Sequence, residues 1–343
     1  MQFDDTSINK ICILSWGLIG DVLVRVSVME AIRQRFPRAT IDVVVDPASR
    51  GAVAYHPDLN KVISFSRIKS PRWRYLFNSC KNILALRRQH YDLCVNLYCG
   101  GSSPLISRLT GARYRLSYNH TRPLRWANNL QVDVPSFCSN WTKALGKMLA
   151  PLGVPLERVR QGTSFYCSTE ADEFAAQLLS KYPGPFLGLN LGAGVDNKRW
   201  PIESYVELMQ LVCEKYDYQI LLFTNPGMAQ LAEEFQQRFK PAERLIRLPQ
   251  CSLGEVGAIM KHCDIMVTGD TSLMHMAFGL KRPTLVLFTQ TRPEIVEPKD
   301  CLHEDCFIAD PSHHDPCGNP LGSRDIPVAY AFEKFDMLAS RID

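Results

Sequence analysis

Short apolar runs alternate with longer segments of helical periodicity along most of the chain. This alternation is typical of parallel strands joined by crossover helices. The predicted strands cover residues 11–15, 40–45, 61–65 and 92–96 in the first half, and residues 186–191, 219–224, 245–247, 265–268 and 284–287 in the second. We therefore predict an α/β protein with two Rossmann-like, doubly wound parallel sheets.

The break between the two predicted sheets falls near residue 160. A helical pattern over residues 140–152 leads into Gly153-Val-Pro-Leu, and residues 155–163 are interpreted as a linker. The predicted parts are an N-terminal domain over residues 1–160, a C-terminal domain over residues 161–325, and a closing helical segment over residues 326–343. Within the second domain, residues 289–325 are rich in Pro, His, Asp and Gly and are predicted to form an irregular loop.

The composition is that of a soluble globular protein, since 46% of the 343 residues are hydrophobic and 22% are charged. The chain begins with Asp4 and Asp5 ahead of its first apolar run, which does not suit a secretory signal, and no later run approaches membrane-spanning length. We therefore expect a cytoplasmic protein. Reduced core thiols are expected in apolar segments, at Cys12, Cys94, Cys213 and Cys263.

One cluster of cysteines and histidines has a composition that could suit a metal. Its members are Cys301, Cys306 and Cys317 with His303, His313 and His314. The spacings lack the paired C-x-x-C that favours zinc, so a plain loop is favoured over a metal site.

Charge is distributed very unevenly along the chain. The net charge is +4, yet twelve Lys or Arg and a single acid, Asp92, lie between Arg67 and Arg125. Such a stretch attracts phosphate-rich ligands or an anionic bilayer, although it could also form a set of solvated helix faces. No recognisable nucleic-acid-binding motif accompanies it, so a nucleic-acid partner is not expected.

Ligands of open parallel sheets bind beyond the carboxyl ends of the strands, which directs attention to the loops there. The first such loop is Trp16-Gly-Leu-Ile-Gly-Asp21. It lacks the G-x-G-x-x-G pattern of dinucleotide sites, so a nicotinamide dehydrogenase is disfavoured. Asp21 could be a helix N-cap or a general base, and the spacing leaves both readings open.

A second loop, residues 191–201, contains Gly192, Gly194 and Lys198 ahead of Pro201. The glycines allow backbone to approach a ligand closely and the lysine supplies a mobile cation, so phosphate binding is the natural interpretation. The alternative is an exposed lysine in a glycine-rich turn.

The third loop, Thr268-Gly-Asp-Thr-Ser-Leu-Met-His275, runs from a predicted strand into a helix. A helix amino terminus presents free N–H groups and partial positive charge, which suits a diphosphate. Asp270 or Thr271 could instead be a simple cap, and His275 a core histidine. The fourth loop, Phe288 to Pro293, is uninformative alone.

Taken together, these loops resemble glycosyltransferase family 9, the ADP-heptose:lipopolysaccharide heptosyltransferases of Gram-negative bacteria. Ile19-Gly-Asp-Val-Leu with Ala31-Ile-Arg-Gln-Arg-Phe-Pro resembles the opening of that family. Lys198-Arg-Trp-Pro resembles its K-x-W-P element, and Asp270-Thr-Ser-Leu-Met-His resembles its D-T-G-x-x-H signature. Order and spacing match across nearly the whole chain.

The resemblance implies a GT-B fold whose two domains face each other across a cleft, with the acceptor on the N-terminal domain and the donor nucleotide on the C-terminal one. The closing helix is then expected to return to the N-terminal domain. By similarity, Asp21 becomes the catalytic base and Lys198 helps to hold the leaving diphosphate. The implied donor site contains Ala193, Gly194, Lys198, Cys251, Asp270, Thr271, Ser272 and His275, with Cys251 near the adenine. The acceptor candidates are Gly20, Arg67, Arg72 and Arg122.

The reaction implied is inverting transfer of a sugar, heptose from ADP-heptose, onto lipopolysaccharide core or a similar anionic glycolipid at the inner face of the inner membrane. No metal site is predicted and no cofactor is required, because a lysine and a helix dipole already face the diphosphate; Mg²⁺ is compatible but not implied. Ser272 and Thr289-Gln290 depart from the family pattern. The alternatives are a relative using another nucleotide sugar or a protein acceptor, and a non-catalytic nucleotide-binding subunit.

Overall fold

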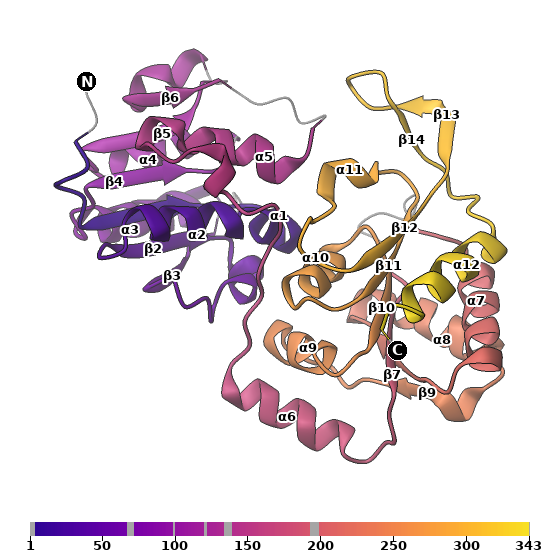
Figure 1. The fold of residues 1–343 in the computed structure, drawn as a ribbon. Coiled ribbons are helices and arrows are strands. Elements are labelled where there is room, and N and C mark those ends of the chain that lie inside the picture. Colours follow the sequence, from indigo (N-terminus) through magenta and orange to yellow (C-terminus); the bar gives the residue numbers. More distant parts are fainter. Residues whose placement is uncertain are drawn as a thin grey trace. The chain divides into compact units, whose positions relative to one another are not determined.

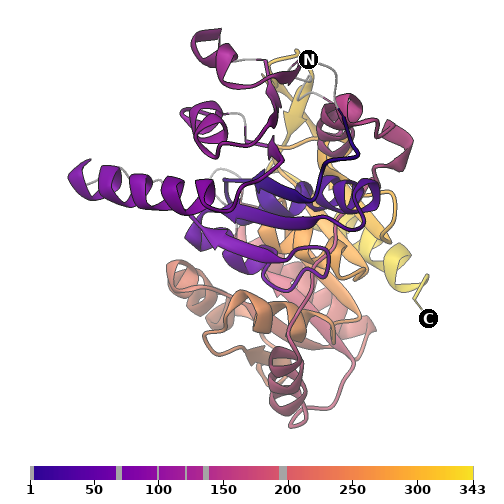
Figure 2. The ribbon, with the colours of Figure 1, turned by 90° about the vertical axis from the view of Figure 1, so that its left-hand side faces the viewer.

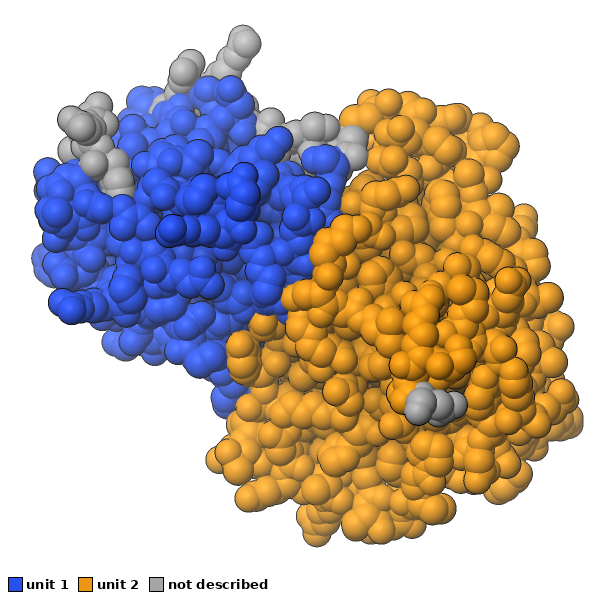
Figure 3. All heavy atoms as spheres, in the orientation of Figure 1, with its two compact units in different colours: residues 1–163 blue, residues 164–343 orange. Residues whose placement is uncertain are grey.

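The computed structural model describes residues 4–66, 72–98, 100–119, 122–133, 139–192 and 199–342. The chain divides into two compact units, Met1–Thr163 and Ser164–Asp343, coloured blue and orange in Figure 3. The domain boundary predicted from the sequence lies between residues 160 and 161. The opposition of the two domains across a cleft stays a prediction, and each unit is described by itself.

Unit 1 contains a six-stranded parallel sheet of order β3-β2-β1-β4-β5-β6 (Figure 1). Its strands are β1 (Lys10–Leu14), β2 (Thr40–Val45), β3 (Lys61–Ser64), β4 (Leu93–Asn96), β5 (Tyr114–Tyr118) and β6 (Leu130–Val132). The strand order reverses between β1 and β4, so the loops that follow these two strands border the point where such sheets bind ligands.

The helices of unit 1 are mostly short. They are α1 (Ile19–Val24), α2 (Val26–Arg35), α3 (Arg72–Arg87), α4 (Ser103–Leu109) and α5 (Trp141–Gly146), with 3₁₀ helices at Pro47–Ala52, Arg122–Ala127, Lys147–Leu152 and Leu156–Arg158. The helical periodicity of residues 21–36 predicts one helix, but the structure has two helices that meet at Arg25. Figure 2 shows α3 projecting sideways from the body of unit 1.

The core of unit 1 is formed by β1 and its neighbours. Cys12 of β1 and Cys94 of β4 are paired in register, and both are fully buried free thiols. Cys213 and Cys263 of unit 2 are free as well. The prediction that these four cysteines are reduced is confirmed.

Unit 2 repeats the architecture, with a six-stranded parallel sheet of order β12-β11-β10-β7-β8-β9. Its strands are β7 (Phe186–Asn190), β8 (Gln219–Phe223), β9 (Leu245–Arg247), β10 (Ile265–Gly269), β11 (Thr284–Phe288) and β12 (His303–Phe307). The order now reverses between β7 and β10. Both units therefore have the doubly wound Rossmann arrangement.

The stretch over residues 289–325 is more regular than predicted. It contains helix α11 (Pro293–Val296), strand β12 and a hairpin of β13 (Ala309–His314) and β14 (Pro320–Gly322), which stands out from the sheet in Figure 1. The irregular-loop prediction was wrong because β12 alternates Glu304 and Cys306, both buried, with polar His303 and Asp305. These charged residues hide the period of two that marks a strand.

The other helices of unit 2 cover the sheet. They are α6 (Thr169–Leu179), α7 (Ile202–Lys215), α8 (Ala229–Arg238), α9 (Leu253–Met260), α10 (Ser272–Gly279) and α12 (Val328–Ala339), with 3₁₀ helices at Pro226–Met228 and Ala242–Arg244. Among the residues that the structure describes, no helix has both the length and the apolar character needed to cross a bilayer.

Helix α12 belongs to the core of unit 2. Its Phe335 is fully buried and packs edge-on against Tyr216 and Tyr218, and its Asp336 accepts hydrogen bonds from Lys215 and Tyr216. Figure 1 shows it beside α7. The apolar stripe of α12 covers the C-terminal sheet, and the return of this segment to the N-terminal domain stays a prediction.

Candidate functional site

The loop that follows β1 makes a tight turn that only glycine allows. Gly17 has a φ of +135°, and a side chain there would place its first carbon 2.7 Å from Oδ2 of Asp21. The Gly17 N–H donates to Asp46 at 3.0 Å, and its carbonyl accepts from the Ser49 hydroxyl at 2.6 Å. The turn is thereby fixed in position, with Asp21 packed against it.

Asp21 is the third residue of α1 and is partly exposed. Its Oδ2 accepts the backbone N–H of Leu18 at 2.9 Å, and within the described part of the chain Leu18 is its only hydrogen-bond donor. Leu18, not Asp21, occupies the N-cap position. Asp21 therefore caps the helix through one carboxylate oxygen, as an acidic residue does at this position, and the other oxygen is available to a ligand.

The strand end beneath this loop is rigidly packed. The Trp16 side chain is fully buried, its indole N–H donates to the Phe65 carbonyl at 3.2 Å, and its ring lies edge-on to Phe65 and Tyr98. Arg25 donates to the Trp16 carbonyl at 2.5 Å. These contacts hold the loop, and hence the Asp21 carboxylate, in one place.

The predicted acceptor residues are only partly described. Gly20 lies partly exposed in the first turn of α1. Arg72 begins α3 and Arg122 begins a 3₁₀ helix, but their side chains are not described, and Arg67 lies outside the described residues. Their grouping around an acceptor stays a prediction.

In unit 2, a buried asparagine joins the two strands at the point where the order reverses. Asn190, the last residue of β7, donates through its side-chain amide to Thr268 Oγ1 at 2.9 Å and to Thr271 Oγ1 at 3.1 Å. Its carbonyl oxygen accepts the Gly192 N–H at 3.1 Å. Asn190 therefore ties the loop after β7 to the loop after β10.

Asn190 was not predicted as a site residue, and Thr268 was named only as the start of the third loop. The available signal was a polar side chain closing an apolar strand, and the same signal occurs in unit 1. There Asn96 closes β4, donates to Ser103 and Ser117, and accepts the N–H of Tyr98. Each sheet thus places a buried asparagine beside its switch point.

Helix α10 begins without a side-chain cap in the described structure. Thr271 occupies the N-cap position in extended backbone and makes no side-chain capping bond. The Asp270 carboxylate instead accepts from the Thr291 hydroxyl at 2.5 Å. Thr271 is therefore the N-cap residue without a side-chain capping bond, and the first turn of α10, including Ser272, is partly exposed. The start of a helix in this state can bind an anion.

Of the remaining candidates for the donor site, the structure describes two and leaves three undescribed. His275 is 8% exposed on α10, and Cys251 precedes Ser252, the N-cap of α9, in the loop after β9. Burial raises the pKa of the Cys251 thiol, so the side chain stays neutral near neutral pH. Ala193, Gly194 and Lys198 lie outside the described residues.

Both departures from the family pattern lie beside this helix start. Ser272 is its first residue, and Thr289 is buried in the loop that also supplies Thr291. Because Thr291 bonds to Asp270, the loop after β11 still contacts the loop after β10.

The family model described as "Glycosyltransferase family 9 (heptosyltransferase)" matches residues 80–312. The chain belongs to glycosyltransferase family 9. It is therefore a glycosyltransferase, as its sequence predicts.

Relatives of this family 9 chain match most of its length. It is 24% identical to lipopolysaccharide heptosyltransferase 3 of Escherichia coli, over 79% of this chain and 81% of that protein. The crystal structure of a glycosyltransferase family 9 protein of Veillonella parvula superposes with a TM-score of 0.84 at 18% identity, covering 99% of both chains. The E. coli ADP-heptose lipopolysaccharide heptosyltransferase II gives a TM-score of 0.79 at 20% identity, over 97% of this chain and 99% of that one. The fold is the GT-B fold of these proteins.

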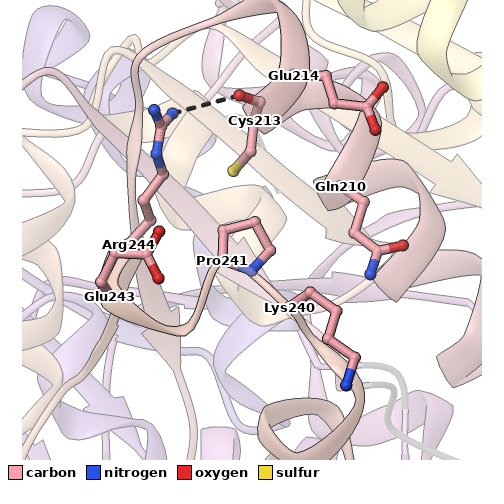
Figure 4. A pocket seen from close by; sticks show the side chains of 7 residues that line it. All are labelled: Gln210, Cys213, Glu214, Lys240, Pro241, Glu243 and Arg244. Carbon is pink, nitrogen blue, oxygen red and sulfur yellow. Dashed lines mark hydrogen bonds between the residues drawn. The ribbon is translucent and has the colours of Figure 1, made fainter.

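A separate pocket of this glycosyltransferase lies away from the switch-point loops. Its volume is about 440 Å³, and Figure 4 shows its lining residues, Gln210, Cys213, Glu214, Lys240, Pro241, Glu243 and Arg244. Residues 240–244 precede β9 and so lie at the amino ends of the strands. Ligands of open parallel sheets bind beyond the carboxyl ends of the strands, so this pocket is not where the donor is expected.

Proposed function

We propose that this glycosyltransferase transfers heptose from ADP-heptose onto lipopolysaccharide core or a similar anionic glycolipid, with inversion at the anomeric carbon. Family membership and the names of the relatives support the donor and acceptor classes. The observation that carries the proposal is the uncapped start of α10, fastened through Thr271 to the buried Asn190.

The diphosphate of the donor binds at the start of α10 in this proposal. Backbone N–H groups of the first turn and the hydroxyls of Thr271 and Ser272 donate to its oxygens, and the helix dipole adds partial positive charge. Lys198, Ala193 and Gly194 of the loop after β7 complete the diphosphate site. Cys251 lies toward the adenine and His275 lines the pocket from α10.

Asp21 is the general base. An acceptor hydroxyl oxygen attacks the anomeric carbon, its proton passes to the Asp21 carboxylate, and the bond from that carbon to the phosphate oxygen breaks. The ADP leaving group carries the released electron pair and is stabilised by the α10 amides and Lys198. No metal is required for these steps, and Mg²⁺ remains compatible with them.

The acceptor is proposed to reach the enzyme at the cytoplasmic face of the inner membrane. The basic stretch between Arg67 and Arg125 supplies positive charge for anionic lipid. Helix α3 adds exposed apolar side chains, since Phe77 and Leu84 are 68% and 53% exposed and flank exposed Lys81. A helix with apolar and cationic exposed positions suits an anionic bilayer surface.

The deciding experiment incubates the full-length protein with ADP-heptose and a deep-core lipopolysaccharide acceptor and reads the product mass. The expected result is a mass gain of one heptose residue together with release of ADP. Product with another nucleotide sugar, or label on protein instead of glycolipid, would favour the alternative relative. Nucleotide binding without any turnover would favour the non-catalytic subunit.

Two further measurements separate the parts of the proposal. Thermal shifts with ADP, UDP and GDP rank the nucleotides, and ADP is expected to give the largest rise. Raising the salt concentration is expected to weaken use of membrane-presented acceptor more than binding of ADP. Equal salt sensitivity of both would argue against the role of the basic stretch.

A further inference from the structure

The end of α11 and the edge strand β12 bring together three side chains that the proposed reaction does not use. Glu297 is the C-cap of α11, and His303 and Asp305 are alternate residues of β12, so they share one face of the strand. One ligand atom of each lies within 4.8 Å of the ligand atoms of the other two. Unit 2 thus contains a compact group of two carboxylates and one imidazole.

The His303 ring is oriented as metal-binding histidines are. Its Nδ1 lies 2.8 Å from the backbone carbonyl of Cys301, and because a carbonyl only accepts, Nδ1 carries the hydrogen. In the neutral ring, Nε2 then bears the lone pair. Donation of the other ring N–H to a carbonyl is the usual arrangement behind a metal–imidazole bond.

The contact between His303 and Asp305 is not a hydrogen bond. Nε2 of His303 lies 3.7 Å from Oδ2 of Asp305, beyond hydrogen-bonding distance. Oδ1 of Asp305 is buried and has no hydrogen-bond partner among the described residues. A buried carboxylate oxygen without a partner is costly, so the arrangement points to a missing positive group.

We propose that Glu297, His303 and Asp305 bind a divalent first-row transition metal ion, with zinc the best match. Nitrogen and oxygen ligands in this combination suit zinc, and an imidazole disfavours Mg²⁺ and Ca²⁺. Three protein ligands leave a position for water. The side chains are 20%, 16% and 18% exposed, so an ion can enter from solvent.

The cysteines nearby are not part of this site. Cys306 lies on the opposite face of β12 from His303, and the Cys301 thiol donates to the Arg282 carbonyl. The ion instead joins the end of α11 to β12 and so braces the edge of the sheet. Lys299 pairs with Glu297 at 2.5 Å and partly balances the two carboxylates before the ion binds.

The test titrates full-length, chelator-treated protein with zinc chloride by calorimetry at neutral pH. The expected result is saturable binding of one ion per chain and a melting temperature that rises with zinc concentration. Asp305→Asn and Glu297→Gln keep the side-chain size and are expected to weaken zinc binding by at least the roughly 10–100-fold that loss of an outer-shell partner costs. Circular dichroism of both variants checks that they fold.

A matched control exists in the same unit. Asp310 accepts from Nδ1 of His313 at 2.8 Å in an exposed histidine–carboxylate pair on β13. Asp310→Asn is expected to bind zinc as the unmodified protein does. If it weakens binding as much as Asp305→Asn, exposed pairs hold the ion and the proposal fails.

A titration with cobalt chloride, followed by visible absorption, shows which side-chain atoms bind the ion. Cobalt bound to nitrogen and oxygen ligands is expected to show visible bands without a thiolate charge-transfer band. A thiolate band that persists in Asp305→Asn, or no saturable binding at all, would overturn the proposal. The measurements use neither nucleotide sugar nor acceptor, so their outcome is independent of the proposed function.

Discussion

The two sheets share one strand order, yet they place opposite chemistry beside their switch points. In unit 1 the loop after β1 presents the Asp21 carboxylate, held by one backbone N–H. In unit 2 the buried Asn190 ties together the loops after β7 and β10, and the second of these loops leads into an uncapped helix start. The first arrangement can accept a proton and the second can bind an anion, so one strand order supports different chemistry through different side chains.

The largest expected effect comes from removing the charge at Asp21. Asp21→Asn keeps an oxygen for the Leu18 N–H, so α1 should stay capped while the base is lost. We expect kcat to fall by about 10²–10⁴ with the Kd for ADP unchanged. Initial rates and calorimetry measure the two quantities.

A matched control for Asp21 lies at the other end of β1. Asp92 also accepts backbone N–H groups, from Asn9 and Lys10, both at 2.9 Å. Asp92→Asn should leave kcat within a few-fold. Near-normal turnover in Asp21→Asn would contradict the role of Asp21 as general base, and with it the chemical difference between the two switch points.

The second expected effect concerns Asn190. Asn190→Ala removes two donor bonds and one acceptor bond from buried groups, which costs about 1–3 kcal/mol. If the network shapes the nucleotide site, ADP binding should weaken by about 5–150-fold. Calorimetric titration measures this change.

Asn225 provides the comparison for Asn190, since it accepts the Gly227 N–H at 2.9 Å at the end of β8 but is exposed. Asn225→Ala should leave the Kd for ADP unchanged. Equal loss in both variants would mean that general loop disorder, not the switch-point network, controls nucleotide binding.

The third effect is on folding. Gly17→Ala forces a side chain into a left-handed backbone region and against Asp21, so the free energy of unfolding should fall by about 1–3 kcal/mol. Gly111 also has positive φ, +80°, but its nearest contact would be 3.6 Å away. Gly111→Ala should therefore cost less in urea unfolding, and an equal or greater cost would contradict the packing described for Asp21.

The smallest effect concerns Asp336. Hydrogen bonds from Lys215 and then Tyr216 lower the pKa of Asp336 in the folded protein. Its contribution to stability is therefore present above the unfolded pKa and is lost as pH falls through the folded pKa. Asp336→Asn should cost about 0.2–1 kcal/mol at neutral pH, since the pair is partly exposed, and nothing in strong acid. A cost independent of pH would show that packing, not charge, is responsible.

The sequence predicted the strands whose apolar runs are unbroken and missed those with polar faces. β1 and β10 are almost wholly apolar and were placed closely, whereas β5 alternates polar Arg115 and Ser117 with Tyr114, Leu116 and Tyr118 and was not predicted. Hairpin β13–β14 was missed because its exposed residues carry no apolar period. Whether such segments form strands depends on pairing with neighbouring strands, and a single sequence does not reveal this pairing.

Local pattern was also a limited guide to side-chain roles. Spacing placed Asp21 and Asp270 at helix starts, but it could not show that Leu18 bonds to the first and Thr291 to the second. Asn190 was overlooked because a lone asparagine has no motif. Its importance comes from two threonines about 80 positions away that only the parallel sheet brings near.

Helix α12 has a consequence for the order in which the protein is made. Phe335 and its neighbours fill the core of unit 2, so one face of its sheet stays uncovered until residues 328–339 have been synthesised. Unit 1, by contrast, holds all its strands within the first 163 residues and can fold while the rest is still being translated. A nascent chain stalled before residue 328 would thus contain a folded unit 1 and a unit 2 whose apolar surface is exposed to solvent. Chaperones bind such exposed apolar surface.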